Sequence, residues 1–326
     1  MKQFQRFMAL ALTLSLAALD RPAAAQPDYP SRIVTIVAPS APGGLYSLFA
    51  RILGHALEQR LGQTFVVENR PGAASVVGAA AVAHAAADGY TLMTASGTTL
   101  AVNVTLRRHL PYDPRTDFVP IALIARVPEV LVVNPALPVH SLADLKALAR
   151  TQPLTFASAG PGTAQHIEGE MLRQALGLDM THVPYKGALP ALNDVVGGHV
   201  TMMFTPVANA LSMIQAGKVR AIGLATRERV EALPDVAPLA DIGLPGFEAG
   251  GWFMLVAPAA TPAPIVARLH AETAAILADP KLREQFIQQG LIPVATPSLD
   301  ELKVFVREQI AYWDRTLHKI GLDGME

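Results

Sequence analysis

Short apolar runs alternate with helical patterns along most of the chain. A β-branched run at 33–37 is followed by a turn rich in Pro and Gly, and then by apolar residues that share one helical face across 48–57. The same order of strand, loop and helix returns with apolar runs at 65–67 and 90–93 and with a helix of small residues expected at 79–87. The pattern predicts one α/β half that is complete by about residue 100.

After a segment rich in Pro, the chain repeats this order in a second half. The strands expected next are at 121–125, 130–133, 154–157, 182–185, 200–204 and 219–225, with helices from Leu142, after residue 163, at 188–196 and at 208–216. A Pro- and Gly-rich stretch at 233–251 then precedes an apolar run at 252–256, which indicates a return to the first half. The C-terminal region is helical, with starts expected near Pro262 and at Ser298.

This arrangement predicts two α/β lobes joined by two crossings, with a cleft between them. We expect a signal peptide at 1–25, the first lobe at 26–128, the second lobe at 129–250, and a return to the first lobe at 251–326. At the N-terminus, Lys2 and Arg6 precede an uncharged run at 7–19, which is shorter than the roughly 17 to 25 residues that span a bilayer. Three alanines then offer a cleavage site near Ala25, so we expect a soluble protein outside the cytoplasm.

Composition narrows the classes of function. Apolar residues make up 51% and charged residues 16% of the chain, which excludes a solvated, disordered protein. Lys and Arg number 26 against 27 Asp and Glu, so the chain has no excess of positive charge for binding nucleic acid. Cysteine is absent, which excludes disulfides, thiolate metal sites and a cysteine nucleophile.

Four loops at strand ends form the candidate site, because open α/β sheets bind ligands outside the carboxyl ends of their strands. They span 40–47, 96–103, 158–166 and 205–209. The first and third end at helix starts, where unpaired N–H groups and a partial positive charge favour an anion. A ligand with two acidic ends would fit between two opposed helix starts. The alternative is that the glycines only permit tight turns.

Catalytic motifs are missing. The Gly-x-Ser-x-Gly elbow fails because Phe156 stands two residues before Ser158, and the nucleotide-binding Gly-x-Gly-x-x-Gly fails because Gln165 holds its last position. The nine His form no His-x-x-x-His pair. We therefore expect no enzymatic activity, no cofactor and no metal, and we interpret His166 as a capping or packing residue.

Ten short motifs, in the same order along the chain, resemble the substrate-binding receptors of tripartite tricarboxylate transporters, also called Bordetella uptake gene receptors. The motifs are Tyr-Pro-Ser-Arg at 29–32, Ala-Pro-Gly-Gly at 41–44, Val-Glu-Asn-Arg-Pro-Gly-Ala at 67–73, Ala-Asp-Gly-Tyr-Thr-Leu at 87–92, Leu-Pro-Tyr-Asp-Pro at 110–114, Leu-Val-Val-Asn-Pro at 131–135, Gly-Thr-Ala-Gln-His at 162–166, His-Val-Pro-Tyr-Lys-Gly at 182–187, Ala-Leu-Pro-Asp-Val at 232–236 and Gly-Leu-Pro-Gly-Phe at 243–247. The resemblance covers almost the whole mature chain.

The resemblance implies a periplasmic clamshell of the type II binding-protein kind, which closes on a small carboxylate and delivers it to integral-membrane permease subunits. It also implies a receptor without enzymatic activity; we expect a monomer. Carried over to this chain, the family's ligand contacts fall on Gly43, Gly44, Leu45, Tyr46, Ser47, Ser96, Thr98, Ser158, Gly162 and Thr163.

Two positions depart from the family pattern. Leu45, Tyr46 and Ser47 stand where relatives carry an acidic residue on the first helical turn, and Thr205 stands where an acidic residue commonly follows a phenylalanine. We therefore include Thr205 among the candidate contacts and expect a carboxylate without an ammonium group, which would lack a carboxylate partner here. The Tyr46 ring either stacks on an aromatic acid or packs on its own lobe.

Two other functions remain as alternatives to a transport receptor. One is a binding module that signals to a membrane sensor, and the other is an enzyme acting on a small carboxylate.

Overall fold

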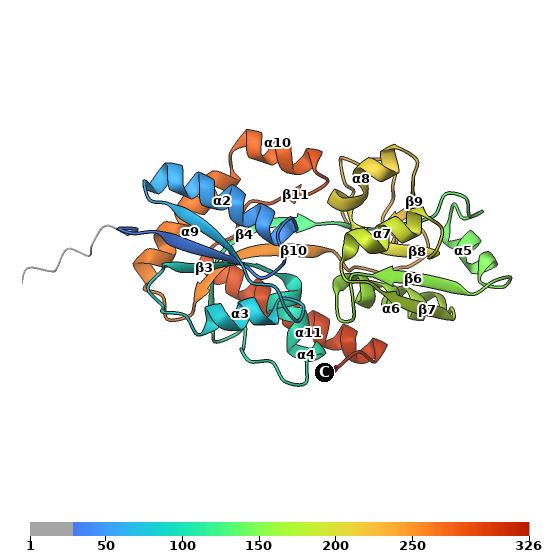
Figure 1. Cartoon of the computed structure of the whole chain (residues 1–326), viewed down its shortest axis with the longest axis horizontal. Helices are drawn as coiled ribbons and strands as arrows, with labels where there is room; N and C mark the ends of the chain where they lie inside the picture. The colour runs from blue at the N-terminus through green and yellow to red at the C-terminus, as the bar shows by residue number, and fades with distance from the viewer. Residues whose placement is uncertain (1–28, 326) are drawn as a thin grey trace, which may run out of the picture.

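The computed structural model describes residues 29–325, so the expected signal peptide lies outside the described residues. The chain forms two α/β lobes, which lie side by side in Figure 1. The first lobe contains a six-stranded sheet in the order β11-β4-β10-β3-β1-β2, and the second contains a five-stranded sheet in the order β7-β6-β8-β5-β9. The prediction of a two-lobed α/β fold is confirmed.

The first lobe places helices on both faces of its sheet. Its strands are β1 (Val34–Ala38), β2 (Phe65–Asn69), β3 (Thr91–Ser96), β4 (Phe118–Val127), β10 (Gly251–Pro258) and β11 (Ile292–Pro293). One face packs against α2 (Leu45–Leu61), α9 (Ala263–Leu277) and α10 (Pro280–Gln288). The other packs against α3 (Val76–Ala83), the π-helical turn η1 (Thr98–Val102), α4 (Asn103–Leu106) and α11 (Leu299–Ile320). Because side chains alternate along a strand, Ile36 enters the first core and Val37 the second.

The second lobe repeats this layering. Its strands are β5 (Glu129–Val133), β6 (Leu154–Ser158), β7 (Met180–Pro184), β8 (Met202–Pro206) and β9 (Arg220–Leu224). Helices α5 (Leu142–Leu148) and α6 (Ala164–Leu176) cover one face, and α7 (Ala188–Val196) and α8 (Val207–Gln215) cover the other. The core under α5 and α6 is continuous with the α11 core of the first lobe, and Gln174 of α6 donates to the Lys319 carbonyl of α11 at 2.8 Å.

Strand pairing shows that the candidate loops lie at the edges where the lobes meet. Only Pro128 separates β4 of the first sheet from β5 of the second. At the start of β10, Phe253 pairs with Ser96, which ends β3, and at the start of β5, Glu129 pairs with Pro206, which ends β8. The carboxyl ends of β1, β3, β6 and β8 therefore face the interlobe crossing.

Two predicted elements differ from the structure. The helix expected at 79–87 is α3 at Val76–Ala83, because the chain turns before Gly89, whose positive φ of 82° leads directly into β3. The C-terminal helical region is divided, because the Asp279 side chain accepts from two backbone N–H groups and starts α10 separately. The start at Ser298 is confirmed by a capping box with Glu301. Within residues 29–325, no helix has both the length and the apolar character that crossing a membrane requires.

Two acidic side chains are buried in the second lobe. Glu129 begins β5 and is 3% exposed, and Glu168 on α6 is fully buried. Oε2 of Glu129 and both carboxyl oxygens of Glu168 have no hydrogen-bond partner among the described residues. Burial raises the pKa of both carboxyl groups well above the usual range, and the charge of Glu129 raises the pKa of Glu168 further. Both groups are therefore neutral in the fold at pH values where they ionise in the unfolded chain.

We predict that Glu168→Gln stabilises the protein at neutral and alkaline pH. When folding raises the pKa of a carboxyl group, the protein loses stability as the pH rises above the pKa of that group in the unfolded chain, which is about 4.3. The loss is about 1.4 kcal/mol for each pH unit until the pKa in the fold is reached. An amide of nearly the same shape has no proton to release, so we expect the free energy of unfolding of Glu168→Gln to exceed that of wild type by an amount that grows from near zero at pH 4 as the pH rises to 8. Denaturant unfolding of both proteins across this range measures the difference. Glu284→Gln on the exposed face of α10 is the control, and parallel curves for wild type and Glu168→Gln would contradict the prediction.

Candidate functional site

The first candidate loop leads into α2 without any side chain to cap the helix. Gly43 has a left-handed φ of 95°, and Gly44 is the N-cap in an extended conformation, with no side-chain hydrogen bond to the first turn. The backbone N–H groups of Leu45, Tyr46 and Ser47 occupy that turn, where a helix offers no internal partner. Both glycines are exposed. This arrangement presents N–H donors and a partial positive charge to the interlobe side.

Hydroxyl groups from separate segments meet beside this helix start. The Tyr46 hydroxyl lies 2.5 Å from Ser96 Oγ and 3.2 Å from Thr99 Oγ1, and Thr99 Oγ1 lies 2.8 Å from Ser75 Oγ. The Tyr46 ring packs edge-on against Phe253 with ring centres 4.8 Å apart. Tyr46 therefore packs on its own lobe, and its hydroxyl belongs to a polar network at the end of β3.

The Ser47 side chain has a structural partner. It is fully buried, and its hydroxyl oxygen accepts from Nδ2 of Asn69 at 2.5 Å. Asn69 also donates to the Ser40 carbonyl at 3.0 Å, so one amide ties both ends of the first loop to the end of β2. At this position only the backbone N–H of Ser47 remains for a ligand.

The loop of the second lobe is held by its own hydrogen bonds. The hydroxyls of Ser158 and Thr163 both donate to the Gly160 carbonyl, at 3.1 and 2.7 Å, and the Gly160 N–H donates to Ser158 Oγ. The Gly162 N–H donates to Nδ1 of His166 at 3.2 Å. These hydrogen bonds use polar groups of Ser158, Gly162 and Thr163, which the family resemblance assigned to the ligand. The first-turn N–H groups of α6 remain, since its N-cap Thr163 makes no side-chain cap.

His166 and His182 both contact the second-lobe loop and hold it in place. The rings of His166 and His182 stack with centres 4.1 Å apart, His182 stacks on Phe156 at 5.0 Å, and His182 Nε2 lies 2.7 Å from Ser158 Oγ. Burial lowers the pKa of His182 to about 4, helped by the neighbouring His166, and burial also lowers the pKa of His166. Both rings are therefore neutral near pH 7, which lets Nδ1 of His166 accept a hydrogen bond. The interpretation of His166 as a capping and packing residue is confirmed.

Some helix starts in the molecule have a side-chain cap and others do not. Helices α5, α10 and α11 are capped by Ser141, Asp279 and Ser298, whose side chains accept from first-turn N–H groups. The helices that follow the carboxyl ends of strands in the two lobes, which are α2, α3, α6, α7 and α8, have no such acceptor. Helix α9 also lacks one, but it starts with prolines at the opposite end of the first lobe. An external anion would complete α2 and α6 as a cap does elsewhere.

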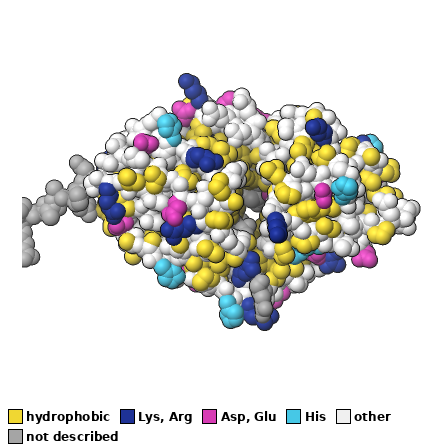
Figure 2. All heavy atoms as spheres, viewed as in Figure 1, with side chains coloured by type: hydrophobic (Ala, Val, Ile, Leu, Met, Phe, Trp, Pro, Cys, Tyr) yellow, Lys and Arg dark blue, Asp and Glu magenta, His cyan; other side chains and the backbone are white. Residues whose placement is uncertain are grey.

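The two lobes approach one another at these loops. A Cβ built on Gly162 would lie 2.9 Å from Leu106 of the first lobe, so the second-lobe loop packs against α4. Figure 2 shows a hollow between the two halves of the molecule. The four candidate loops contain no Asp, Glu, Lys or Arg. Any charged ligand group here therefore meets neutral hydrogen-bonding groups and helix dipoles.

The remaining candidate residues differ in their accessibility. Thr98 starts η1 directly after the Ser96 network and is partly exposed. Thr205 lies near the end of β8 at the interlobe edge, but it is fully buried and its hydroxyl has no partner among the described residues.

Sequence reasoning missed Asn69, Thr99 and His182, which hold the loops in place. Their polar side chains next to strand ends were the available signal. No cluster of three or more His, Asp or Glu side chains suited to a metal ion is present between residues 29 and 325.

Known proteins are similar to this chain over most of its length. The sequence pattern of the tripartite tricarboxylate transporter family receptors matches residues 49–322. BugT of Bordetella pertussis is 34% identical over 316 residues, which cover 96% of this chain and 96% of that protein. The similarity extends through both lobes.

Solved structures give the same result. Rpa4515 of R. palustris, described with adipate, is 34% identical with a TM-score of 0.85, and the alignment covers 91% of this chain and all of that one. MatC from Rhodopseudomonas palustris, described with bound malate, is 34% identical with a TM-score of 0.80, and the alignment covers 89% of this chain and all of that one.

We predict that His182 remains neutral well below the pH at which free histidine takes up a proton. Its imidazole should titrate near pH 4, because burial and the stacked His166 ring disfavour the charged form. The exposed His318 is the internal control, because hydrogen bonding at the Asp314 carbonyl raises its pKa above the ordinary value. An NMR titration of the imidazole C–H signals separates the two. A His182 signal that titrates near pH 6.5 would show that the ring is not packed under the loop.

Proposed function

The chain belongs to the tripartite tricarboxylate transporter family of receptors, and from this membership we propose that it captures a small organic acid between its lobes and delivers it to a membrane permease. The family is one of receptors rather than enzymes. We further propose that the protein acts as a monomer in the periplasm after removal of its signal peptide.

One observation carries the proposal: two uncapped helix starts, α2 and α6, at the facing edges of two lobes. The first-turn N–H groups of each helix would hold one carboxylate of the ligand, in the way that side-chain oxygens cap α5, α10 and α11. The hydroxyls of Tyr46, Ser96 and Thr98 would add hydrogen bonds on the first lobe. Ser158 and Gly162 would act through the shape of the second loop, because their polar groups already bond within the lobe.

The similar structures support a dicarboxylate as the ligand. Adipate and malate both carry two carboxylates, and the proteins described with them share 34% of their residues with this chain. A dicarboxylate also suits two opposed helix starts better than a ligand with a single acidic end. Closure of the lobes would enclose both carboxylates and present the closed form to the permease.

We predict that a dicarboxylate such as adipate or malate stabilises the protein, and that Gly44→Phe removes this effect. Ligand at 100 times its dissociation constant should add about 2.7 kcal/mol to the unfolding free energy. Gly44 has φ −85° and ψ 177°, and a Cβ there would meet nothing closer than Ser40 Oγ at 3.9 Å. A large side chain should therefore fold normally but occupy the space in front of α2. A thermal-shift titration measures both effects.

Ala311→Leu is the matched control, because it enlarges an exposed residue on α11, away from the cleft. It should keep the full ligand-induced shift. If Gly44→Phe folds with the wild-type melting temperature and still shows that shift, the first loop is not the anion site.

We also predict that the receptor binds succinate at least tenfold more tightly than aspartate. The candidate loops offer no carboxylate to an ammonium group, and the partial positive charge of the helix starts opposes one. Malate is the control, since its added group is a neutral hydroxyl, and it should bind nearly as well as succinate. Calorimetric titration compares the three acids, and equal or tighter binding of aspartate would refute the assignment of ligand class.

A further inference from the structure

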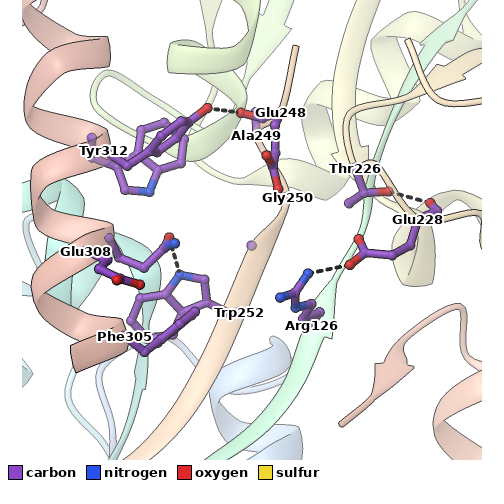
Figure 3. Close-up of a pocket in the computed structure, with 13 residues that line it drawn as sticks. Arg126, Thr226, Glu228, Glu248, Ala249, Gly250, Trp252, Phe305, Glu308 and Tyr312 are labelled. Atoms are coloured by element: carbon purple, nitrogen blue, oxygen red, sulfur yellow. Dashed lines mark hydrogen bonds and ion pairs between the residues drawn. The ribbon is translucent and has the colours of Figure 1, made fainter. Parts of the chain in front are cut away.

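A second cavity, of about 220 Å³, lies behind the strands that connect the lobes (Figure 3). Neighbouring side chains on a strand point to opposite faces, and β10 shows which face this is. Phe253 packs on Tyr46 of α2, at the cleft, whereas Trp252 packs on Phe305 of α11 with ring centres 5.0 Å apart. The cavity lies on the α11 face, and no residue of the four candidate loops lines it, so it is distinct from the proposed acid site.

Aromatic rings form one wall of this cavity. Phe305, Tyr312 and Trp313 come from α11, and Trp252 comes from β10 (Figure 3). The polar ends of two rings are already used, since Trp252 Nε1 donates to Gln309 at 3.0 Å and the Tyr312 hydroxyl donates to the Glu248 carbonyl at 2.5 Å. The Trp252 and Tyr312 rings are thus fixed, and neither has an N–H or O–H group left to donate to a ligand.

Among the charged side chains around the cavity, one carboxylate has no ion-pair partner within the described residues. Arg126 pairs with Glu228 at 2.5 Å, and Arg227, beside the cavity, pairs with Glu248 at 2.8 Å. Glu308 lines the cavity from the same side of α11 as Phe305 and Tyr312, and it makes no ion pair or hydrogen bond within the described part of the chain. The cavity therefore combines aromatic surface with an unpaired negative charge.

We propose that this cavity binds an organic cation, an alkylammonium or guanidinium group, held against the aromatic wall with Glu308 as its counter-ion. Cations are attracted to aromatic rings, most strongly to tryptophan, when they lie within about 6 Å of the ring centre. An anion would find few donors here, which is the reverse of the interlobe cleft. Because Arg126 belongs to the first lobe and Thr226 and Glu228 belong to the second, the cation would lie between groups of both lobes.

The two tryptophans of the chain both line the cavity, so intrinsic fluorescence reports on it directly. We expect agmatine, a probe with a guanidinium and an ammonium group, to change the fluorescence of the full chain in a saturable way, and the uncharged N-butylurea, which lacks both cationic groups, to leave it unchanged. Glu308→Gln should weaken agmatine binding at least fivefold, and Phe305→Leu should weaken it similarly. Glu284→Gln on α10 removes the same charge far from the cavity and should leave binding unchanged.

The absence of a saturable change with agmatine would overturn the proposal, and so would equal weakening by Glu308→Gln and Glu284→Gln, which would show only a response to net charge. Calorimetry on the same variants should give the same order of affinities. N-acetylarginine amide distinguishes the source of the cation. Tighter binding than agmatine indicates an arginine side chain of a partner protein, and weaker binding indicates a free small cation.

Discussion

The unpartnered backbone N–H groups at the starts of α2 and α6 are the constraint from which the proposed function follows. A helix start leaves donors that must be satisfied, and this chain satisfies them with Ser141, Asp279 and Ser298 at three other helices. At the starts of α2 and α6 it places Gly44 and Thr163 instead, and neither side chain caps its helix. An acidic ligand completes both helices at once only when the lobes are near each other.

The surrounding polar groups keep these donors in position without competing for the ligand. Asn69 ties the first loop, and His166 and His182 brace the second. Both histidines stay neutral because their rings are packed, so no charged side chain of the four loops takes part. The cavity lined by Trp252 and Phe305 has the opposite character, with aromatic surface and carboxylates. One molecule thus presents donors on one side of its connecting strands and acceptors on the other.

Much of the fold and part of the site could be predicted from sequence. Apolar periodicity located most of the strands and predicted the two-lobed α/β fold, and glycine loops before helices indicated the candidate loops. The partners of individual polar groups could not be predicted, because Tyr46 meets Ser96 and Ser158 meets His182 only after the sheets form. Glu168 resembles any solvent-facing residue of a helix, yet packing against the second sheet buries it completely. The cavity lined by Trp252 and Phe305 could not be predicted either, because it forms only where β10 and α11 lie side by side.

The most direct test of the central claim is a crystal structure of the receptor with a dicarboxylate that it binds. The account predicts one carboxylate within hydrogen-bond distance of the backbone N–H groups of Leu45 to Ser47, and the other at the first turn of α6, near Ala164 and Gln165. A ligand held by a single lobe, or bound in the cavity beside Trp252, would contradict it.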